Sequence, residues 1–329
     1  MPANSAATRS RSGSGVPARE TAFSHEMLTY AGGDDGFLEG TLEPVRQALA
    51  RDAGVLVVVT GARASALREA LGDVGARVRF ADIRELGTNP ARSFPLWQDF
   101  AAEHAVNGHA SALGISETVW PGRNPAELTE CERQEALLNL AFDDARAWQL
   151  LCTYDLDGLD DQVIEDAKRA HPLLARDGSA HANETYACDH DAPQPFAGSL
   201  PEPRTRVHEL AFAGATLAQL RHALADWARA RGLGDDGTEE LVLAVDELAS
   251  NSVRHGGGSG TLRCWRDGES LVCEVKDSGH IQAPLIGRRR PQPEACSGRG
   301  VWLVNQLCDL VQIRSNPTGS VVRVHKRLT

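Results

Sequence analysis

The sequence predicts an α/β protein of two domains, the first a doubly wound sheet with helices on both faces. In the first half of the chain, β-branched runs alternate with segments of helical periodicity. Near the middle, residues 176–204 are rich in Pro, Gly, Ser and Asp without an apolar period, as expected of a linker. The length of 329 residues, 42% of them hydrophobic, is enough for two cores.

Composition excludes several classes of protein. With 45 Asp and Glu against 34 Lys and Arg, the net charge is −11, so direct nucleic-acid binding through phosphate neutralisation is not expected. No apolar stretch approaches the roughly 20 residues of a membrane span, and residues 1–20 read as a disordered tail rather than a signal peptide. Seven cysteines without a CxxC pair fit reduced thiols. We therefore expect a cytoplasmic protein.

One group of side chains has the chemistry of metal ligands. His181, Cys188 and His190 lie close together in the sequence, within the predicted linker. Their spacing is not that of a zinc site, so we do not expect a metal there.

The first domain is predicted to span residues 21–175. The run GVLVVVT at 54–60 predicts a buried parallel strand, followed by a helix at 62–71. Further along the chain we expect a strand at 78–82, a helix at 96–106, a strand at 110–115, a helix at 128–148 and a strand at 150–154. The turn after GVLVVVT, GARAS, has neither a P-loop nor a G-x-G-x-x-G motif, so it does not predict a nucleotide site.

This first half resembles the MEDS sensory domain. The resemblance depends on His25, Tyr30, the turn at 36–38, the strand GVLVVVT and the strand end at 152–155. It implies a RecA-like doubly wound fold without a P-loop, and an input role for a small-molecule or protein signal. His25, Tyr30 and Cys152 are either packing residues or contacts for that signal, and both alternatives stay open.

The second domain, residues 205–329, is predicted to hold five strands and three helices. The strands are expected at 207–212, 261–265, 270–276, 310–315 and 320–326, and the helices at 216–231, 238–255 and 301–310. Asp236 and Glu239 predict a capping box at the start of the second helix. On that helix Glu247, Asn251 and His255 recur every fourth residue, so acid, amide and imidazole line one ridge beside an apolar stripe.

Two short motifs follow that helix. The strand 270–276 runs into Asp277-Ser278-Gly279, where a carboxylate could accept a hydrogen bond from an exocyclic amine while the glycine lets a ring approach. Further on, Gly298-Arg299-Gly300 opens a helix, and bare backbone amides there suit a phosphate. Each motif alone is common in proteins.

Together the three motifs resemble the GHKL, or Bergerat, ATP-binding superfamily. Within it the chain is similar to the anti-sigma factor serine kinases that carry an N-terminal MEDS domain, most specifically in GRGVWLVNQLCD at 298–309. The resemblance implies an α/β two-layer sandwich with ATP and Mg²⁺ as cofactors. It implies a sigma factor and an anti-sigma factor antagonist as partners, and a homodimer, since relatives commonly dimerise.

The resemblance also implies roles for individual residues. Glu247 would align or deprotonate the attacking hydroxyl, and Asn251 would hold Mg²⁺. Asp277 would select adenine, Gly279 would let the base approach, and Ser320 stands where many relatives have Thr. The residues expected around the phosphates are Arg254, His255, Gly298, Arg299, Gly300 and Val301.

Residues 283–297 would form a lid over the nucleotide. Arg288, Arg289 and Arg290 either contact phosphate or are solvated, and both alternatives stay open. Ile281 stands where the superfamily often has a second glycine after the D-x-G motif, which alters how the lid begins.

Three functions remain in view. The first is an ATP-dependent protein serine kinase acting on an anti-sigma factor antagonist, which the carboxylate of Glu247 favours. The second is an anti-sigma factor that binds nucleotide without turnover. The third, a sensor histidine kinase-like protein, is disfavoured because no helical dimerisation segment with a phospho-accepting His precedes residue 207.

Overall fold

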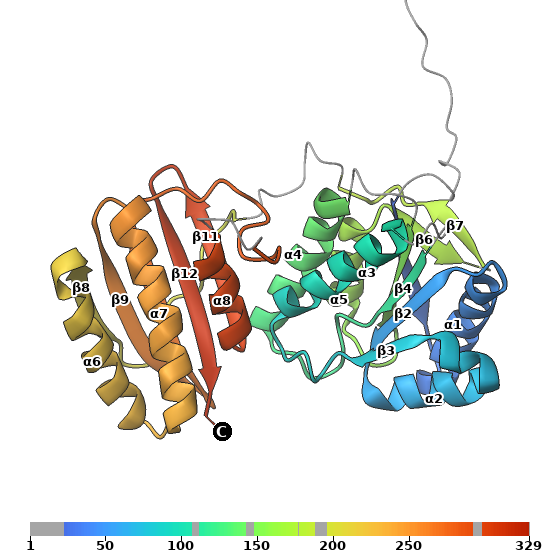
Figure 1. Cartoon of the computed structure of the whole chain (residues 1–329), viewed down its shortest axis with the longest axis horizontal. Coiled ribbons are helices and arrows are strands. Elements are labelled where there is room, and N and C mark those ends of the chain that lie inside the picture. The colour runs from blue at the N-terminus through green and yellow to red at the C-terminus, as the bar shows by residue number, and fades with distance from the viewer. Residues whose placement is uncertain are drawn as a thin grey trace, which may run out of the picture.

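The computed structural model of the chain describes residues 23–106, 112–142, 148–176, 178–187, 196–291 and 298–328. The predicted tail at 1–20 lies outside these residues, as do Cys188, His190 and part of the predicted lid. Two α/β units lie side by side, the first in blue to green and the second in yellow to red (Figure 1). No helix in the described part of the chain is long and apolar enough to cross a membrane.

The first unit is built on a seven-stranded sheet of order β3-β2-β4-β5-β1-β6-β7. Each pairing is parallel except that of β6 with β7. The strands are β1 Phe23–Tyr30, β2 Gly54–Val59, β3 Arg79–Asp82, β4 Ala112–Ser116, β5 Trp148–Asp155, β6 Leu173–Arg176 and β7 Ser179–Ala182. The valines of β2 are fully buried, as expected of a strand covered on both faces.

Helices cover both faces of this sheet. They are α1 Gly33–Ala50, α2 Gly61–Leu71, α3 Phe94–Val106, α4 Pro125–Phe142 and α5 Asp161–Ala170, with short 3₁₀ turns η1 Gly72–Arg77 and η2 Pro90–Ser93. Phe37 and Leu67, on α1 and α2, belong to the core on one face. Trp97, Leu138 and Ile164, on the other three helices, belong to the core on the opposite face. The doubly wound fold predicted from the sequence is therefore confirmed.

An ion cluster occupies the turn where a P-loop would lie. Arg63, near the start of α2, pairs with Glu117, which directly follows β4, and, at 2.9 Å, with Asp155, the last residue of β5. Burial lowers the pKa of Arg63 but the carboxylates, Glu117 above all, raise it beyond its ordinary value. Buried acids at this edge would repel a polyphosphate, which agrees with the absence of a nucleotide motif in the sequence.

Several first-domain predictions were wrong in detail. The helix predicted at 128–148 ends at Phe142, and Trp148 opens β5. The turn at 36–38 lies inside α1. The sequence did not predict α5 or the β6–β7 pair, and β7 lies in the segment expected to be linker. Of these elements, β6 pairs with β1, which is distant in sequence, and β7 pairs with β6, so local periodicity missed both strands.

The second unit is a two-layer sandwich. Its antiparallel sheet has the order β11-β12-β10-β9-β8, and three helices cover one face (Figure 1). The strands are β8 His208–Ala213, β9 Ser259–Asp267, β10 Ser270–Asp277, β11 Leu310–Asn316 and β12 Gly319–Arg327, and the helices are α6 Leu217–Arg229, α7 Asp235–His255 and α8 Arg299–Leu307. Leu224, Leu248 and Val304, one from each helix, pack on Leu271 and Val324 of the sheet.

Two helix limits differ from prediction. The start of α7 is Asp235, with Gly234 as N-cap and no side-chain capping bond, so the capping box of Asp236 and Glu239 is wrong. Asp235 and Asp236 instead both lie in the first turn, where the helix dipole favours negative charge. The end of α8 is Leu307 rather than residue 310, because Leu310 opens β11.

Candidate functional site

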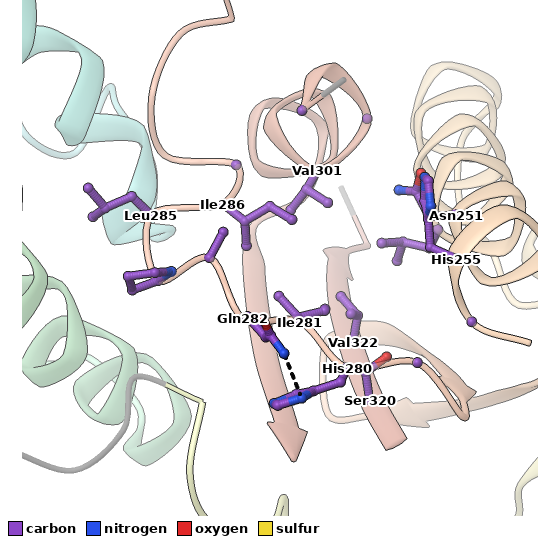
Figure 2. Close-up of a pocket in the computed structure, with 18 of the residues that line it drawn as sticks. Asn251, His255, His280, Ile281, Gln282, Leu285, Ile286, Val301, Ser320 and Val322 are labelled. Atoms are coloured by element: carbon purple, nitrogen blue, oxygen red, sulfur yellow. Dashed lines mark hydrogen bonds between the residues drawn. The ribbon is translucent and has the colours of Figure 1, made fainter. Parts of the chain in front are cut away.

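The polar ridge of α7 borders a large cavity. Figure 2 shows Asn251 and His255 facing it from this helix, across from Ile281 and Val322. The cavity has a volume of about 840 Å³, which suits a nucleotide-sized ligand. Beneath the ridge, Leu248 is buried and forms part of the apolar wall.

Asp277, at the end of β10, has a carboxylate held in place from three directions. Ser252 Oγ on α7 donates to Oδ2 at 2.6 Å. Ser320 Oγ on β12, the residue paired with Asp277 in the sheet, donates to Oδ1 at 2.8 Å, and so does the backbone N–H of Gly279. These bonds leave acceptor capacity on the carboxylate, which is therefore oriented and able to receive a donor from a ligand.

Missing side chains make room beside this carboxylate. A Cβ on Gly256 would lie 2.5 Å from the Asp277 carboxyl carbon, and a Cβ on Gly279 would lie 2.9 Å from the Gly256 Cα. Both glycines line the cavity. Their smallness lets backbone and carboxylate approach closely, so a flat ring can reach Asp277.

The start of α8 forms the other end of the cavity. Gly298 takes a left-handed conformation with φ 86° and caps the helix without a side-chain hydrogen bond. The first backbone N–H groups of a helix lack intrahelical partners and, with the helix dipole, favour an anion. Gly298, Gly300 and Val301 line the cavity at this point.

Glu247 lines a smaller hollow, which shares Gly300 with the cavity. A Cβ on Gly300 would lie 2.7 Å from Glu247 Oε2 and 3.2 Å from Asn251 Nδ2, so α7 and α8 meet closely here. The hollow, of about 380 Å³, is lined by Glu247, Arg299 and Gly300 together with Trp302 and Leu303. A carboxylate and an amide thus lie one helical turn apart beside the anion-binding helix start.

The described part of the lid packs on the first domain. Leu285 packs against the core of the first domain, and Leu140 of α4 lines the cavity from that side. Arg289 Nη2 donates to Ala141 O at 3.4 Å, and Arg290 pairs with Asp99 at 3.1 Å. These contacts join the lid to the first domain, and Arg289 and Arg290 also line the cavity, so both alternatives for the lid arginines stay predictions.

One face of α4 carries three of the polar contacts between the domains. Three side chains about one turn apart each bond an arginine of the second domain. The pairs are Arg327 Nη2 with Glu127 Oε1 at 3.1 Å, Arg314 Nη2 with Glu130 Oε1 at 2.9 Å, and Arg288 Nη1 with Gln134 Oε1 at 2.6 Å. Burial lowers the pKa of Arg288 to about 10, which still leaves the guanidinium charged at neutral pH.

A second contact joins η2 to α8. Arg92 Nη2 donates to Gln306 O at 2.8 Å and to Cys308 O at 3.0 Å, which satisfies carbonyls at the end of that helix. Asn305, on the same helix, donates to the lid at Gly287 O, at 3.0 Å. The helix whose start borders the cavity is therefore fastened to the first domain at its other end.

Most of the predicted site residues converge on this cavity. Asn251, His255, Asp277, Gly279, Gly298, Gly300, Val301 and Ser320 all line it, and Glu247 and Arg299 line the adjoining hollow. Arg254 is exposed and is not among the described residues that line either space. Ile281 donates its backbone N–H to Ser315 Oγ at 2.8 Å, which fixes the start of the lid on β11.

Sequence reasoning missed three contributors. Ser252 was not among the predicted site residues, although it bonds Asp277. Gly256 lines the cavity and directly follows α7. The sequence could have indicated it, because this glycine comes directly after the E-x-x-x-N-x-x-x-H ridge. Leu140 had no local signal, since only the docking of the two domains places it at the cavity.

Comparison with known families agrees with this geometry. Residues 210–326 match the family model described as histidine kinase-like ATPase domain. The second domain is thus an ATPase domain of the GHKL type. Residues 24–172 match the model described as MEDS, the methanogen/methylotroph, DcmR sensory domain. The chain therefore joins a MEDS sensory domain to a histidine kinase-like ATPase domain, as the sequence resemblance implied.

Solved structures give weaker similarities. The RsbU and RsbW domains of a Mycobacterium tuberculosis protein align at 16% identity with a TM-score of 0.30, over 37% of this chain and 32% of that one. The Acinetobacter baumannii histidine kinase AdeS aligns at 11% identity with a TM-score of 0.24, over 38% of this chain and 70% of that one. The chain thus spans about a third of the first of these proteins. No curated protein matches it.

Proposed function

We propose that this protein is an ATP-dependent serine kinase that phosphorylates an anti-sigma factor antagonist and so regulates transcription through sequestration of a sigma factor. Its support is the ATPase domain, the sequence similarity to anti-sigma factor serine kinases, and the arrangement around Glu247. The last of these carries the proposal. The Glu247 carboxylate lines the hollow through which we expect the serine hydroxyl of the antagonist to approach the γ-phosphate.

The residues present fit ATP. Asp277 has a fixed carboxylate with spare acceptor capacity, which suits the exocyclic amine of adenine. Leu248, Val275 and Val322 supply apolar walls for the ring. The uncapped start of α8 suits the phosphates.

The residues also fit Mg²⁺. Asn251 offers a side-chain oxygen at the cavity wall, and hard divalent cations take such oxygens together with water and phosphate oxygens. When bound, the ion would neutralise phosphate charge. Asn251 is the described residue to which we assign it.

We assign the acceptor hydroxyl to Glu247. The serine oxygen would approach through the hollow that Glu247 and Arg299 line. That oxygen forms the new bond to the γ-phosphorus while the bond from phosphorus to the bridging oxygen of ADP breaks, and Glu247 takes the serine proton. Arg299 would balance charge on the transferred group.

The first domain is placed to regulate this chemistry. The lid begins beside Asp277 and continues onto the first domain through Leu285 and Arg288. A signal that shifts α4 would therefore move the lid and Leu140, which border the cavity. This gives the MEDS domain a route to ATP binding that passes through side-chain contacts.

The test is phosphotransfer to the antagonist. Full-length protein is incubated with Mg²⁺, γ-labelled ATP and candidate antagonists encoded near it, and the modified residue is located by mass spectrometry. We expect one serine of one antagonist to be labelled. If the protein binds ATP and a sigma subunit but labels no antagonist, the kinase proposal is wrong and a nucleotide-responsive anti-sigma factor remains. Labelling of a histidine in the protein itself would favour the histidine kinase-like alternative.

A further inference from the structure

Four side chains that could bind a metal meet in the interior of the first domain. His25 lies on β1, Glu135 on α4, Cys152 on β5, and His171 directly after α5. One ligand atom from each lies within 4.8 Å of the other three, and all four residues are buried. His25 lies 110 residues from Glu135 and 127 residues from Cys152 in the sequence, so the fold alone brings these side chains together.

Four of the six separations between these atoms are close to those in a tetrahedral zinc site. His25 Nε2 lies 3.1 Å from Glu135 Oε2 and 3.3 Å from Cys152 Sγ. Glu135 Oε2 lies 3.3 Å from Cys152 Sγ and 3.5 Å from His171 Nε2. Bond lengths of about 2.0–2.1 Å to N or O and about 2.3 Å to S place tetrahedral ligands about 3.3–3.6 Å apart.

Outer hydrogen bonds aim both imidazoles at the same point. His171 Nδ1 lies 2.7 Å from Ala167 O, which only accepts, so in the neutral imidazole Nδ1 carries the proton and Nε2 a lone pair. Asn139 donates its amide to Ala170 O, which turns its Oδ1 toward His25 Nδ1 at 2.9 Å. His25 therefore also presents an Nε2 lone pair, and both histidines have the second-shell partners typical of metal ligands.

Without a cation this arrangement lacks donors. Two imidazole lone pairs and a carboxylate oxygen face a single thiol proton in a site closed to solvent. Among the described residues, His171 Nε2, one of the proposed ligand atoms, has no hydrogen-bond partner. Buried polar atoms are rarely left so, and each costs about 1–3 kcal/mol.

We propose that His25, Glu135, Cys152 and His171 bind one divalent transition-metal ion, Zn²⁺ by geometry and ligand type, in the core of the sensory domain. Two nitrogens, one sulfur and one oxygen in a tetrahedral array suit Zn²⁺, whereas Mg²⁺ and Ca²⁺ take oxygen ligands. The Cys152 thiol loses its proton on binding, and the proton leaves to solvent. Because all four ligands come from protein and are buried, the ion is held inside the fold.

The experiment uses full-length protein expressed in minimal medium with Zn²⁺ or Co²⁺, with any affinity tag removed. We expect stoichiometric zinc after dialysis, and for the Co²⁺ form the intense visible bands of a tetrahedral site with a thiolate-to-cobalt charge-transfer band. X-ray absorption of the zinc form should show one sulfur among four ligands. Folded wild-type protein that retains neither metal, or whose spectrum shows no sulfur ligand, would overturn the proposal.

Variants assign the ligands. Cys152→Ser should abolish the charge-transfer band, and Asn139→Ala should weaken metal affinity roughly 10- to 100-fold through loss of the outer hydrogen bond. Cys131→Ala is the matched control. Cys131 is also a buried thiol and lies one helical turn before Glu135, but its sulfur faces Thr118 O and not the proposed site. An unchanged charge-transfer band in Cys152→Ser, or its loss in Cys131→Ala, would contradict the assignment. If Cys152→Ser does not fold, the number of sulfur ligands seen by X-ray absorption in the wild-type zinc form tests the assignment instead.

Discussion

The side-chain amide of Asn89, on the first domain, donates two hydrogen bonds to Asn305 of the ATPase domain. One reaches the backbone oxygen of Asn305 at 3.1 Å and the other its side-chain oxygen at 3.0 Å. Asn305 in turn donates to Gly287 O in the lid and to Val301 O near the start of α8. Both asparagines are buried. A single chain of hydrogen bonds thus connects the sensory domain to two walls of the nucleotide cavity.

Asn89→Ala should weaken ATP binding by the full-length protein. The substitution leaves the buried Asn305 Oδ1 without its donor from the first domain, which costs about 1–3 kcal/mol, and it loosens the residue that holds Gly287. We expect the ATP dissociation constant, measured by calorimetry, to rise at least about 5-fold, the lower range of coupling between sites. Gln162→Ala, on the exposed surface of α5, is the control. An affinity equal to that of wild type would show that this contact does not support the cavity.

Asp277→Asn should weaken adenine nucleotides selectively. The amide oxygen can still accept from Ser320 and Gly279, but the amide nitrogen replaces the oxygen that faces Ser252. We expect a loss of about 1–3 kcal/mol in ATP binding, the range for a buried hydrogen bond to a charged group. Asp267→Asn, at the exposed end of β9, should have no effect. Equal weakening of ATP and GTP would count against an adenine contact.

Gly300→Ala should impair phosphotransfer more than folding. The added methyl group would meet Glu247 Oε2 at 2.7 Å and Asn251 Nδ2 at 3.2 Å, so both side chains must move. Alanine is otherwise favourable inside a helix. We expect the rate of phosphotransfer to fall at least about 10-fold, which corresponds to about 1.4 kcal/mol of activation free energy. The melting temperature should stay close to that of wild type. Gly234→Ala is the control, because nothing lies within 4 Å of its added Cβ. A normal rate in Gly300→Ala would mean that Glu247 and Asn251 are not needed where they lie.

His325 should make the ATPase domain less stable in mild acid. Burial and the neighbouring Arg323 lower the pKa of His325 to about 4, while the unfolded chain titrates near 6.5. Between these values the unfolded state binds more protons, so stability falls as the pH falls from about 6.5 to 4. We expect His325→Gln, which can still donate to Gln312, to remove about 2 kcal/mol of the stability difference between pH 7 and pH 5 in urea titrations. A variant with the same pH dependence as wild type would exclude His325 as its source.

The sequence predicted those features that depend on neighbours along the chain. The ridge of Glu247, Asn251 and His255 follows from helical period, and the buried valines of β2 follow from a continuous apolar run. Both domain folds were confirmed. The roles assigned to the site residues stay predictions, although the fold brings most of those residues to one cavity.

Features that depend on distant contacts were not predictable from local pattern. The sequence named His25 and Cys152 as packing residues or contacts for a signal, not as metal ligands. Glu135 and His171 lie on other elements and share no spacing motif with them. The search for zinc spacing instead led to His181, Cys188 and His190, and the last two lie outside the described residues. The contacts of Asn89 and Leu140 exist only because two domains dock, which no periodicity encodes.

The most direct test of the kinase proposal compares Glu247→Gln with Glu239→Gln, an exposed acid near the start of the same helix. Antagonist phosphorylation is followed in single turnover, and ATP affinity is measured in parallel. If Glu247 takes the serine proton, Glu247→Gln should bind ATP almost as well as wild type but transfer phosphate roughly 10² to 10⁴ times more slowly, and Glu239→Gln should behave as wild type. A Glu247→Gln protein that transfers phosphate at the wild-type rate would contradict the proposed role of this carboxylate.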